Sequence, residues 1–474
     1  MMVPSNRMLG LVALVFIPAL TLMGAGGATL RYGAVGLLVA IGLLLIDAVL
    51  SFDRMRNLSV EASSPVHGIV GRDFEVQLQV SWPQSGQLSL TLEMDCPDAV
   101  LPVKFPSRVD VTDDSAVTGA AENASKTTRA AGAKAPLAHD VPKVMRITGQ
   151  SRVIERGRHE LGPIHAQTPS VLGFWLIRRE LGTRICVHGY PDLHPDRRQL
   201  AAQLFAKNSG AIASVLTGRG RSFDRLRDYV SGDELDDIHW RATAKRRKPI
   251  TKLYELEKDQ RVYVAIDQSR LSSRASPRQT PAEDEPVSLL ERYINTALVL
   301  GSVAQAQGDQ FGLLGFSDSV TGFLPAGTGP AHYRACREAV LEFRSRRVNA
   351  DYKELFSFFA SKVRRRSMLF VLTTVDDPAL CEELIESSKI IADRHLVITA
   401  AVTPAHAKSL AEAEPIDDEG EIIERLAAHL IWKRLRQTAR KLGQNGVKYL
   451  SLEHDTMVPS LVGNYTRLKR GQVL

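Results

Sequence analysis

The first fifty residues of the chain are apolar without a clear period, whereas the rest carries regular patterns of apolar and polar positions. One uncharged stretch lies between Arg7 and Arg31, and a second runs from Tyr32 to Phe52 with Asp47 as its single charge. Each has about the 20 residues that a helix needs to cross a bilayer. Soluble helices seldom stay apolar on every side over this length. The pattern therefore predicts a transmembrane helical hairpin within residues 1–57.

Charges beside the two stretches predict how such a hairpin is oriented. Arg7 precedes the first stretch, and Arg54 and Arg56 follow the second. Because Lys and Arg next to membrane spans favour the cytoplasmic side, both ends of the hairpin are expected in the cytoplasm. We therefore expect a multi-pass protein of the cell (inner) membrane that contacts lipid through two spans, with the bulk of the chain cytoplasmic.

From residue 58 to residue 195, apolar residues recur at every second position, as in half-buried strands. The segments 74–82, FEVQLQVSW, and 88–94, LSLTLEM, show this alternation most clearly, and turn-forming residues bound them. The region is expected to form an antiparallel β domain of the sandwich type. Residues 109–140 interrupt it. They are rich in Ala, Ser, Thr and Gly, with few large apolar side chains, so we expect a mobile surface insertion there.

Residues 196–260 form a separate segment, which carries the motif described below, and the pattern then changes to strands and helices in alternation over residues 261–474. Residues 261–267, RVYVAID, form an apolar run that ends in an aspartate, and residues 287–308 have the spacing of an amphipathic helix. Further strands are predicted at 310–316, 319–324 and 367–374. This alternation predicts a Rossmann-like α/β domain with a mainly parallel sheet. Ligands of such sheets bind at the carboxyl ends of the strands, which makes Asp267 the first candidate.

Composition places the chain among folded proteins and excludes several classes. Its 474 residues are 44% hydrophobic and 24% charged, and 60 Lys and Arg against 53 Asp and Glu leave a formal net charge of +7. This charge is too dilute to indicate a nucleic-acid partner. The four cysteines are scattered without a C-x-x-C pair, which excludes a disulfide-stapled scaffold and a cysteine zinc module.

The residues at the end of the strand 261–267 carry the candidate metal chemistry. Asp267 and Ser269 begin a loop that resembles the D-x-S-x-S loop of von Willebrand factor A domains, in which carboxylate and hydroxyl oxygens hold a Mg²⁺ ion. Leu271 stands where that loop has its second serine, and Thr374 stands where the later aspartate of those domains is expected. The resemblance implies a degenerate site, so no cofactor is expected; the ion that such a loop would hold is Mg²⁺.

The segment before that strand carries a more specific pattern. Residues 221–260, RSFDRLRDYVSGDELDDIHWRATAKRRKPITKLYELEKDQ, resemble the signature of the domain of unknown function 58 family. The matching positions include Arg227, Tyr229, Gly232, Asp233, His239, Trp240 and Lys252. His239 departs from the signature, which has an aspartate there. Upstream, RGRHELGPI at 156–164 and SVLGFW at 170–175 resemble elements of the family's β domain.

The resemblance implies a membrane-anchored protein with a β domain and a von Willebrand A-like domain, from a family often encoded beside a MoxR-type AAA+ ATPase. We therefore expect a protein-interaction or adaptor protein without a catalytic site. It would work with that ATPase in the assembly or maturation of a client protein at the cell membrane. Within the motif, Arg227, Asp233, His239 and Lys252 are expected to form a polar network that holds the segment against the sheet, with Tyr229 and Trp240 as packing anchors.

One alternative is a hydrolytic enzyme. Asp233 lies six residues before His239, and Asp455 directly follows His454. A carboxylate near an imidazole can orient it for acid or base catalysis. No activated serine or cysteine accompanies either pair in the sequence, so no catalytic residue is assigned.

Another alternative is binding of anionic lipid or nucleic acid through basic runs at 218–227, 245–248 and 364–366. No aromatic residues alternate with these runs as they do in single-strand binders, so no nucleic acid is expected. The simpler interpretation is a solvated basic surface near a membrane, where anionic lipid attracts Lys and Arg.

Overall fold

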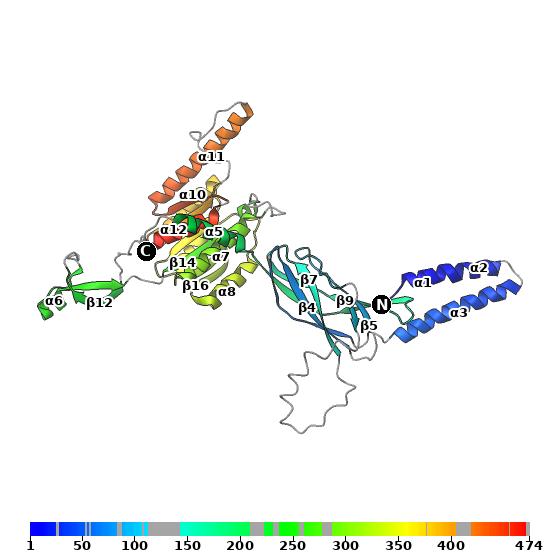
Figure 1. Ribbon diagram of the computed structural model, residues 1–474. Helices are drawn as coiled ribbons and strands as arrows, with labels where there is room; N and C mark the ends of the chain where they lie inside the picture. The colour runs from blue at the N-terminus through cyan, green and yellow to red at the C-terminus, as the bar shows by residue number, and fades with distance from the viewer. Residues whose placement is uncertain are drawn as a thin grey trace, which may run out of the picture. The chain divides into compact units, whose positions relative to one another are not determined.

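The structure is a computed structural model that describes residues 1–24, 28–52, 55, 58–82, 88–106, 109–111, 143–208, 222–230, 237–255, 260–276, 287–375, 377–403, 419–454 and 456–470. The chain divides into two compact units, residues 1–190 and 191–474 (Figure 1). The predicted hairpin and β domain lie in the first unit, and the motif segment and α/β region lie in the second. Of the predicted insertion, residues 109–111 form a strand, and residues 112–140 lie outside the described residues.

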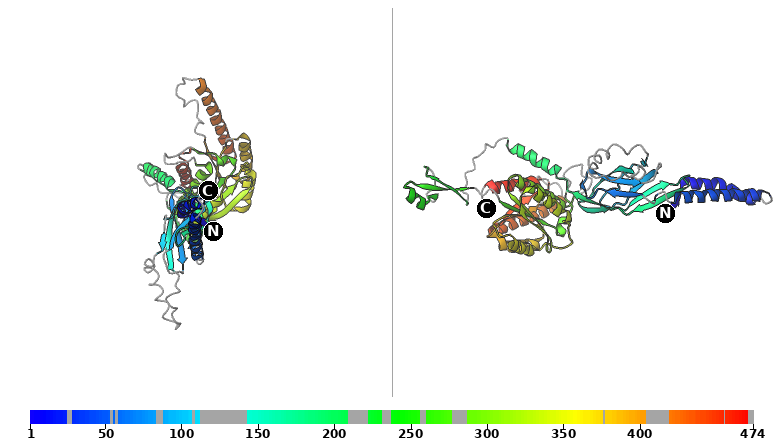
Figure 2. Two further views of the ribbon diagram at one scale, coloured as in Figure 1. Left: turned by 90° about the vertical axis from the view of Figure 1, so that its right-hand side faces the viewer. Right: turned by 90° about the horizontal axis from the view of Figure 1, so that it is seen from below.

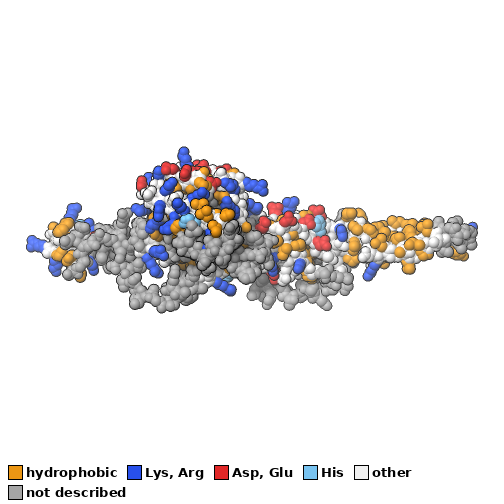
Figure 3. All heavy atoms as spheres, turned by 90° about the horizontal axis from the view of Figure 1, so that it is seen from above, with side chains coloured by type: hydrophobic (Ala, Val, Ile, Leu, Met, Phe, Trp, Pro, Cys, Tyr) orange, Lys and Arg blue, Asp and Glu red, His pale blue; other side chains and the backbone are white. Residues whose placement is uncertain are grey.

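Two helical arms begin the first unit. The first arm consists of α1 (Asn6–Leu11), a π-helical segment (Val12–Phe16) and α2 (Ile17–Gly24), and the second is α3 (Ala28–Ser51), which packs beside α2. The π-helical turns come just before Pro18, which lacks the N–H that a regular helix would use. Hydrophobic side chains dominate the surface of these arms (Figure 3).

Among the described residues, one helix is long and apolar enough to cross a membrane: Arg31–Ser51, with a mean hydropathy of 2.5. The first arm contains a shorter apolar stretch, Asn6–Thr21. Length and composition thus give one candidate span where the sequence pattern predicted two. The second predicted span is present as the helix α3. That both arms cross a membrane stays a prediction.

The strands of the first unit form three sheets, ordered β1-β10-β9-β5-β6, β3-β11-β8 and β2-β4-β7. They are β1 (Met2–Pro4), β2 (Ser59–Ala62), β3 (Val66–Ile69), β4 (Asp73–Trp82), β5 (Leu88–Met94), β6 (Val109–Val111), β7 (Lys143–Arg152), β8 (Gly157–Leu161), β9 (Ile164–Pro169), β10 (Trp175–Leu181) and β11 (Ile185–Tyr190). The described pairs are antiparallel except β3 with β11. Alternate residues of β4, from Phe74 to Val80, point into one core that all three sheets share, as the sequence alternation predicts.

The loop between β9 and β10 binds the end of α3 through a buried carboxylate. Asp47 is 0% exposed and accepts hydrogen bonds from Ser170 Oγ at 2.6 Å, Leu172 N at 2.9 Å and Phe174 N at 3.3 Å. A buried charge is tolerated only where hydrogen bonds replace its water. The single charge of the second apolar stretch therefore joins the helix to the β domain.

Further contacts strengthen this joint. Ser51 Oγ accepts a hydrogen bond from Val171 N at 3.0 Å, and Trp175 Nε1 donates to the carbonyl of Leu44 at 3.1 Å. At the other end of the hairpin, β1 pairs with β10, with Met2 opposite Ile177. Both ends of the helical hairpin are thus fastened to the same loop and strand, which contain the SVLGFW segment.

The second unit is built on a six-stranded sheet ordered β16-β15-β14-β17-β18-β19. Its elements are α5 (His194–Asn208), β14 (Arg261–Asp267), α7 (Leu289–Ala306), β15 (Gln310–Phe316), β16 (Val320–Gly327), α8 (Gly329–Ala339), α9 (Tyr352–Lys362), β17 (Met368–Thr373), α10 (Pro378–Ala392), β18 (Leu396–Val402), α11 (Glu419–Gln444), β19 (Lys448–Leu452) and α12 (Met457–Arg470). Only β16 runs antiparallel to its neighbour in this sheet. The predicted mainly parallel sheet is confirmed.

Helices cover both faces of this sheet, as two views of the second unit show (Figure 2). Along β14, Val262, Val264 and Ile266 contribute to a core with α7 and α12, whereas Tyr263 and Ala265 contribute to a core with α9 and α10. A strand buried on both sides has a continuous apolar sequence, as this strand does. The chain continues from β14 to β15 on one side and later to β17 on the other, so the topological switch point lies at β14.

Candidate functional site

The carboxyl end of β14 lies at the switch point, and Asp267 is its last residue. The side chain is 1% exposed. One carboxylate oxygen accepts a hydrogen bond from Ser269 N at 2.7 Å, and the other accepts one from Thr373 Oγ1 at 2.6 Å. Burial raises the pKa of the Asp267 carboxyl above its ordinary value of 3.8, and the Thr373 hydrogen bond partly opposes this rise.

Two buried tyrosines close the same edge. Thr373 donates its proton to Asp267, so the Tyr352 hydroxyl of α9, 2.8 Å away, donates to Thr373. Tyr293 of α7 lies with its hydroxyl 2.9 Å from Thr374 Oγ1. Burial, and secondly the charge of Asp267, hold the pKa of Tyr352 well above its ordinary value. The Tyr352 phenol therefore remains a donor at neutral pH. Tyr352, Thr373 and Asp267 thus form an ordered chain of hydrogen bonds.

The loop that resembles a metal site makes hydrogen bonds within the protein. Leu271 is buried, and Ser272 Oγ donates to the carbonyl of Ser269 at 2.7 Å. Among the described residues, no group of three or more His, Cys, Asp and Glu side chains could hold a metal ion. A Mg²⁺ ion needs several accessible oxygen ligands, whereas both Asp267 oxygens already accept hydrogen bonds from the protein. Both Asp267 oxygens therefore belong to an internal network of hydrogen bonds.

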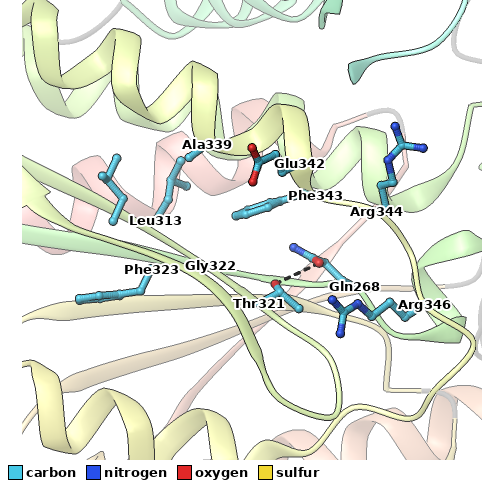
Figure 4. Close-up of a pocket in the computed structure, with 11 residues that line it drawn as sticks. Gln268, Leu313, Thr321, Gly322, Phe323, Ala339, Glu342, Phe343, Arg344 and Arg346 are labelled. Atoms are coloured by element: carbon cyan, nitrogen blue, oxygen red, sulfur yellow. Dashed lines mark hydrogen bonds between the residues drawn. The ribbon is translucent and has the colours of Figure 1, made fainter. Parts of the chain in front are cut away.

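A cavity of about 480 Å³ lies beside this edge, between β16 and the segment that follows α8 (Figure 4). Gln268 lines it and is 1% exposed, with its Oε1 accepting a hydrogen bond from Thr321 Oγ1 at 3.1 Å. Phe343 forms part of the wall, and the side chains of Arg344 and Arg346 extend from the same segment (Figure 4). Glu342 also lines the cavity, which thus offers a ligand apolar side chains, two cations and one carboxylate.

The motif segment forms an antiparallel hairpin of its own. β12 (Ser222–Asp228) pairs with β13 (Ile250–Glu255), and the helix α6 (Trp240–Arg246) lies between them in the sequence. His239 begins α6, because its Nδ1 accepts a hydrogen bond from Ala242 N at 3.2 Å. Ile238 forms a bridge to Thr251, and Ile238 and Ile250 are both buried. Two of the motif residues, Gly232 and Asp233, lie outside the described residues.

The prediction that Trp240 is a packing anchor is wrong. Trp240 is 69% exposed, because Ile238 and Ile250 fill the small interior of the hairpin and Trp240 starts α6 on an outer face. Arg227 is exposed, whereas Tyr229 and Lys252 are half-buried. Strand pairing places Arg227 opposite Thr251, next to Lys252. Because successive residues of a strand point to opposite faces, the pairing places Arg227 and Lys252 on opposite faces of the hairpin.

The helix α6 and the turn after it carry five exposed cations and no acidic residue. They are Arg241, Lys245, Arg246, Arg247 and Lys248. The basic run 245–248 therefore shares this surface with Trp240. The run 364–366 is exposed before β17, at the amino end of the strand, and so lies at the sheet edge opposite Asp267. Residues 218–221 of the remaining run lie outside the described residues.

One candidate catalytic pair is brought together that the sequence did not indicate. His454 Nδ1 lies 2.8 Å from Ser276 Oγ. Ser276 is 1% exposed, which keeps its hydroxyl from a substrate in this conformation. The other candidate, His239, uses its Nδ1 to cap α6, and Asp455 lies outside the described residues. Ser276 could not be found from sequence because 178 residues separate it from His454.

Comparison with solved structures gives remote likenesses. A conserved hypothetical protein BatB from Bacteroides thetaiotaomicron is 14% identical, with a TM-score of 0.28, over 45% of this chain and 99% of that one. An aerotolerance-related membrane protein from Bacteroides fragilis is 14% identical, with a TM-score of 0.27, over the same shares. A membrane-spanning protein from Vibrio fischeri is 14% identical, with a TM-score of 0.17, over 44% of this chain and 98% of that one. Similarities with TM-scores this low do not indicate a function for this chain.

No curated protein matches the chain. The family described as "Protein of unknown function DUF58" matches residues 225–423. That range contains most of the motif hairpin and the sheet from β14 to β18. Over these residues, the match confirms the similarity to the domain of unknown function 58 family that the motif indicated.

Proposed function

We propose that this chain is a membrane-anchored interaction protein that serves as an adaptor for a MoxR-type AAA+ ATPase in the assembly or maturation of a client at the cell membrane. Two N-terminal spans would anchor it in the inner membrane, with the bulk of the chain cytoplasmic. The second unit, as a von Willebrand A-like domain, would carry the docking surface. The family match over residues 225–423 and the apolar helix Arg31–Ser51 support this proposal.

The observation that carries the proposal is the exposure of Trp240 within a cationic surface. Trp and Arg are the side chains most enriched among those that dominate binding energy at protein interfaces. A tryptophan that is 69% exposed gains much apolar contact when a partner covers it. The five cations around it favour a partner with an acidic surface.

A photo-cross-linker at Arg241 in native membranes tests this role. We expect an adduct with an AAA+ ATPase, and we expect Trp240→Ala to reduce its yield at least about tenfold, since a central aromatic contributes about 2 kcal/mol or more. The double variant Lys245→Ala/Arg246→Ala should weaken it too, whereas Arg364→Ala/Arg365→Ala, which removes the same charge elsewhere, should not. An adduct without any ATPase, or one insensitive to Trp240→Ala, would refute the proposal.

A hydrolytic enzyme is the second candidate, and the 2.8 Å contact between Ser276 Oγ and His454 Nδ1 favours it. A base within hydrogen-bond reach is what a serine nucleophile requires. The burial of Ser276 opposes this role. A fluorophosphonate probe separates the two functions: labelling that Ser276→Ala abolishes would establish the enzyme, and we expect none.

A further inference from the structure

Helix α11 carries an apolar stripe that no described part of the chain covers. Ile422, Ile423, Leu426 and Leu430 are 50%, 72%, 51% and 55% exposed. At 3.6 residues per turn, these four side chains fall within an arc of about 100° on one side of the helix. The face that packs on the domain, with the buried Ala428, Leu435 and Leu442, is centred about 165° away. The stripe is thus separate from the packed face.

The stripe lies on the part of α11 that extends beyond the sheet (Figures 1 and 2). Because an amphipathic helix of a globular domain needs only one apolar face, a second one indicates another apolar environment. Four neighbouring Ile and Leu side chains on one arc form a continuous patch, and continuous exposed patches mark interaction sites more often than single residues do.

Positive charge continues from the stripe along the same helix. Lys433, Arg434, Arg440 and Lys441 are exposed, and the Arg436 guanidinium lies 4.9 Å from the centre of the Trp432 ring. Counted over the sequence of α11, six Lys and Arg against three Glu leave a charge of +3. The ligand of this face therefore combines apolar and anionic groups.

We propose that this face of α11 binds an anionic lipid surface. Ile422, Ile423, Leu426 and Leu430 enter the boundary between headgroups and acyl chains, and the Lys and Arg residues that follow contact the phosphates. An in-plane amphipathic helix with Lys, Arg and Trp beside an apolar face has this composition. The proposal rests on the membrane anchoring proposed above, since an anchored chain has a lipid surface within its reach.

Area favours lipid over a protein partner. The four side chains expose roughly 400 Å², about half of the 800 Å² per partner that a stable protein complex buries. A lipid surface needs no such area, because shallow apolar insertion and electrostatic attraction add to an existing anchor. A second copy of the chain is disfavoured because both copies bring the same positive charge.

Hydrogen exchange of the full-length protein tests the proposal, with the chain in nanodiscs of phosphatidylcholine alone or with phosphatidylglycerol. Amides 422–434 should exchange about tenfold more slowly in the anionic discs, since insertion suppresses local opening of the helix. About 0.5 M salt should remove most of this protection. The double variant Ile423→Glu/Leu426→Glu should abolish it, whereas Ile390→Glu, at a residue of α10 that is 46% exposed, should not.

Equal exchange in both discs would overturn the proposal, as would protection that appears in detergent and grows with protein concentration, because the latter identifies a second copy. Unchanged exchange of β17 and β18 in the variants shows that the domain remains folded. Release of the chain from membranes by alkali would refute the anchoring itself. An anchored chain whose α11 amides stay unprotected refutes this inference alone.

Discussion

The joint at Asp47 permits a quantitative prediction. Replacing Asp47 by Ala removes the acceptor for Ser170 Oγ, Leu172 N and Phe174 N at once. The loop between β9 and β10 should then separate readily from α3. The β strands should remain folded, because their core does not include Asp47.

The expected cost follows from the three hydrogen bonds. A bond to a charged acceptor contributes about 1.5–3 kcal/mol, and a buried donor left without a partner costs a similar amount. The side chains of Val171 and Leu172 are 55% and 43% exposed, so water can reach part of the loop once it is released. Because water then replaces part of each interaction, we expect about 1 kcal/mol for each of the three bonds, below that range, and a loss of about 3 kcal/mol for local opening, which corresponds to about 150-fold.

Hydrogen exchange at the Leu172 and Phe174 amides measures this opening directly in the full chain in detergent. Asp47→Ala should accelerate both about 100-fold or more, and Asp47→Asn, which keeps one acceptor oxygen, should lie about midway on a logarithmic scale. Ser51→Ala removes one bond, to Val171 N, and should accelerate exchange about fivefold. Val49→Ala, at a side chain that is 75% exposed, is the control. Acceleration below about threefold in Asp47→Ala would refute the reasoning.

Three further outcomes are expected. Trp240→Ala should change the melting temperature by less than about 2 °C, because an exposed ring contributes little to stability, and a larger fall would show that the ring is buried. Because the pKa of Asp267 is raised in the folded protein, its carboxyl keeps the proton at pH values above 3.8. Its contribution to stability is therefore full below pH 3.8 and is lost as pH rises through the raised pKa. Asp267→Asn should remove this decline when melting is compared between about pH 4 and 7. Burial lowers the pKa of His395 from 6.5 to about 4, so stability is lost as pH falls from 6.5 towards 4, and His395→Phe should resist acid better.

Strands and helices of the second unit were predictable because burial imposes their pattern. The segments 261–267 and 310–316 are strands with the predicted bounds, and the helix predicted at 287–308 spans Leu289–Ala306. The strands 73–82 and 88–94 followed equally from their alternation. Each of these strands and helices packs one or both of its faces against a core, and the packed positions must be apolar.

Side-chain surroundings were less predictable, because they depend on residues distant in sequence. Trp240 was expected inside because it is large and apolar, but only the folded hairpin shows that Ile238 and Ile250 already fill the interior. The hydrogen bond from Thr373 to Asp267 joins residues that are 106 positions apart in the sequence. The cavity beside Gln268 combines β15 and β16 with a segment after α8, and no sequence signal indicated that Phe343 or Arg344 lines a cavity there.

The pairing of β1 with β10 has a consequence for biogenesis. Met2 finds its partner, Ile177, only after about 175 residues have followed it from the ribosome. Until the helical hairpin turns back and returns the N-terminal strand, β10 keeps an open edge, which is a template for pairing with other chains. Packing of the two helical arms and closure of the sheet are thus one event for this protein, and a chain whose arms fail to pack leaves β10 with an unpaired edge.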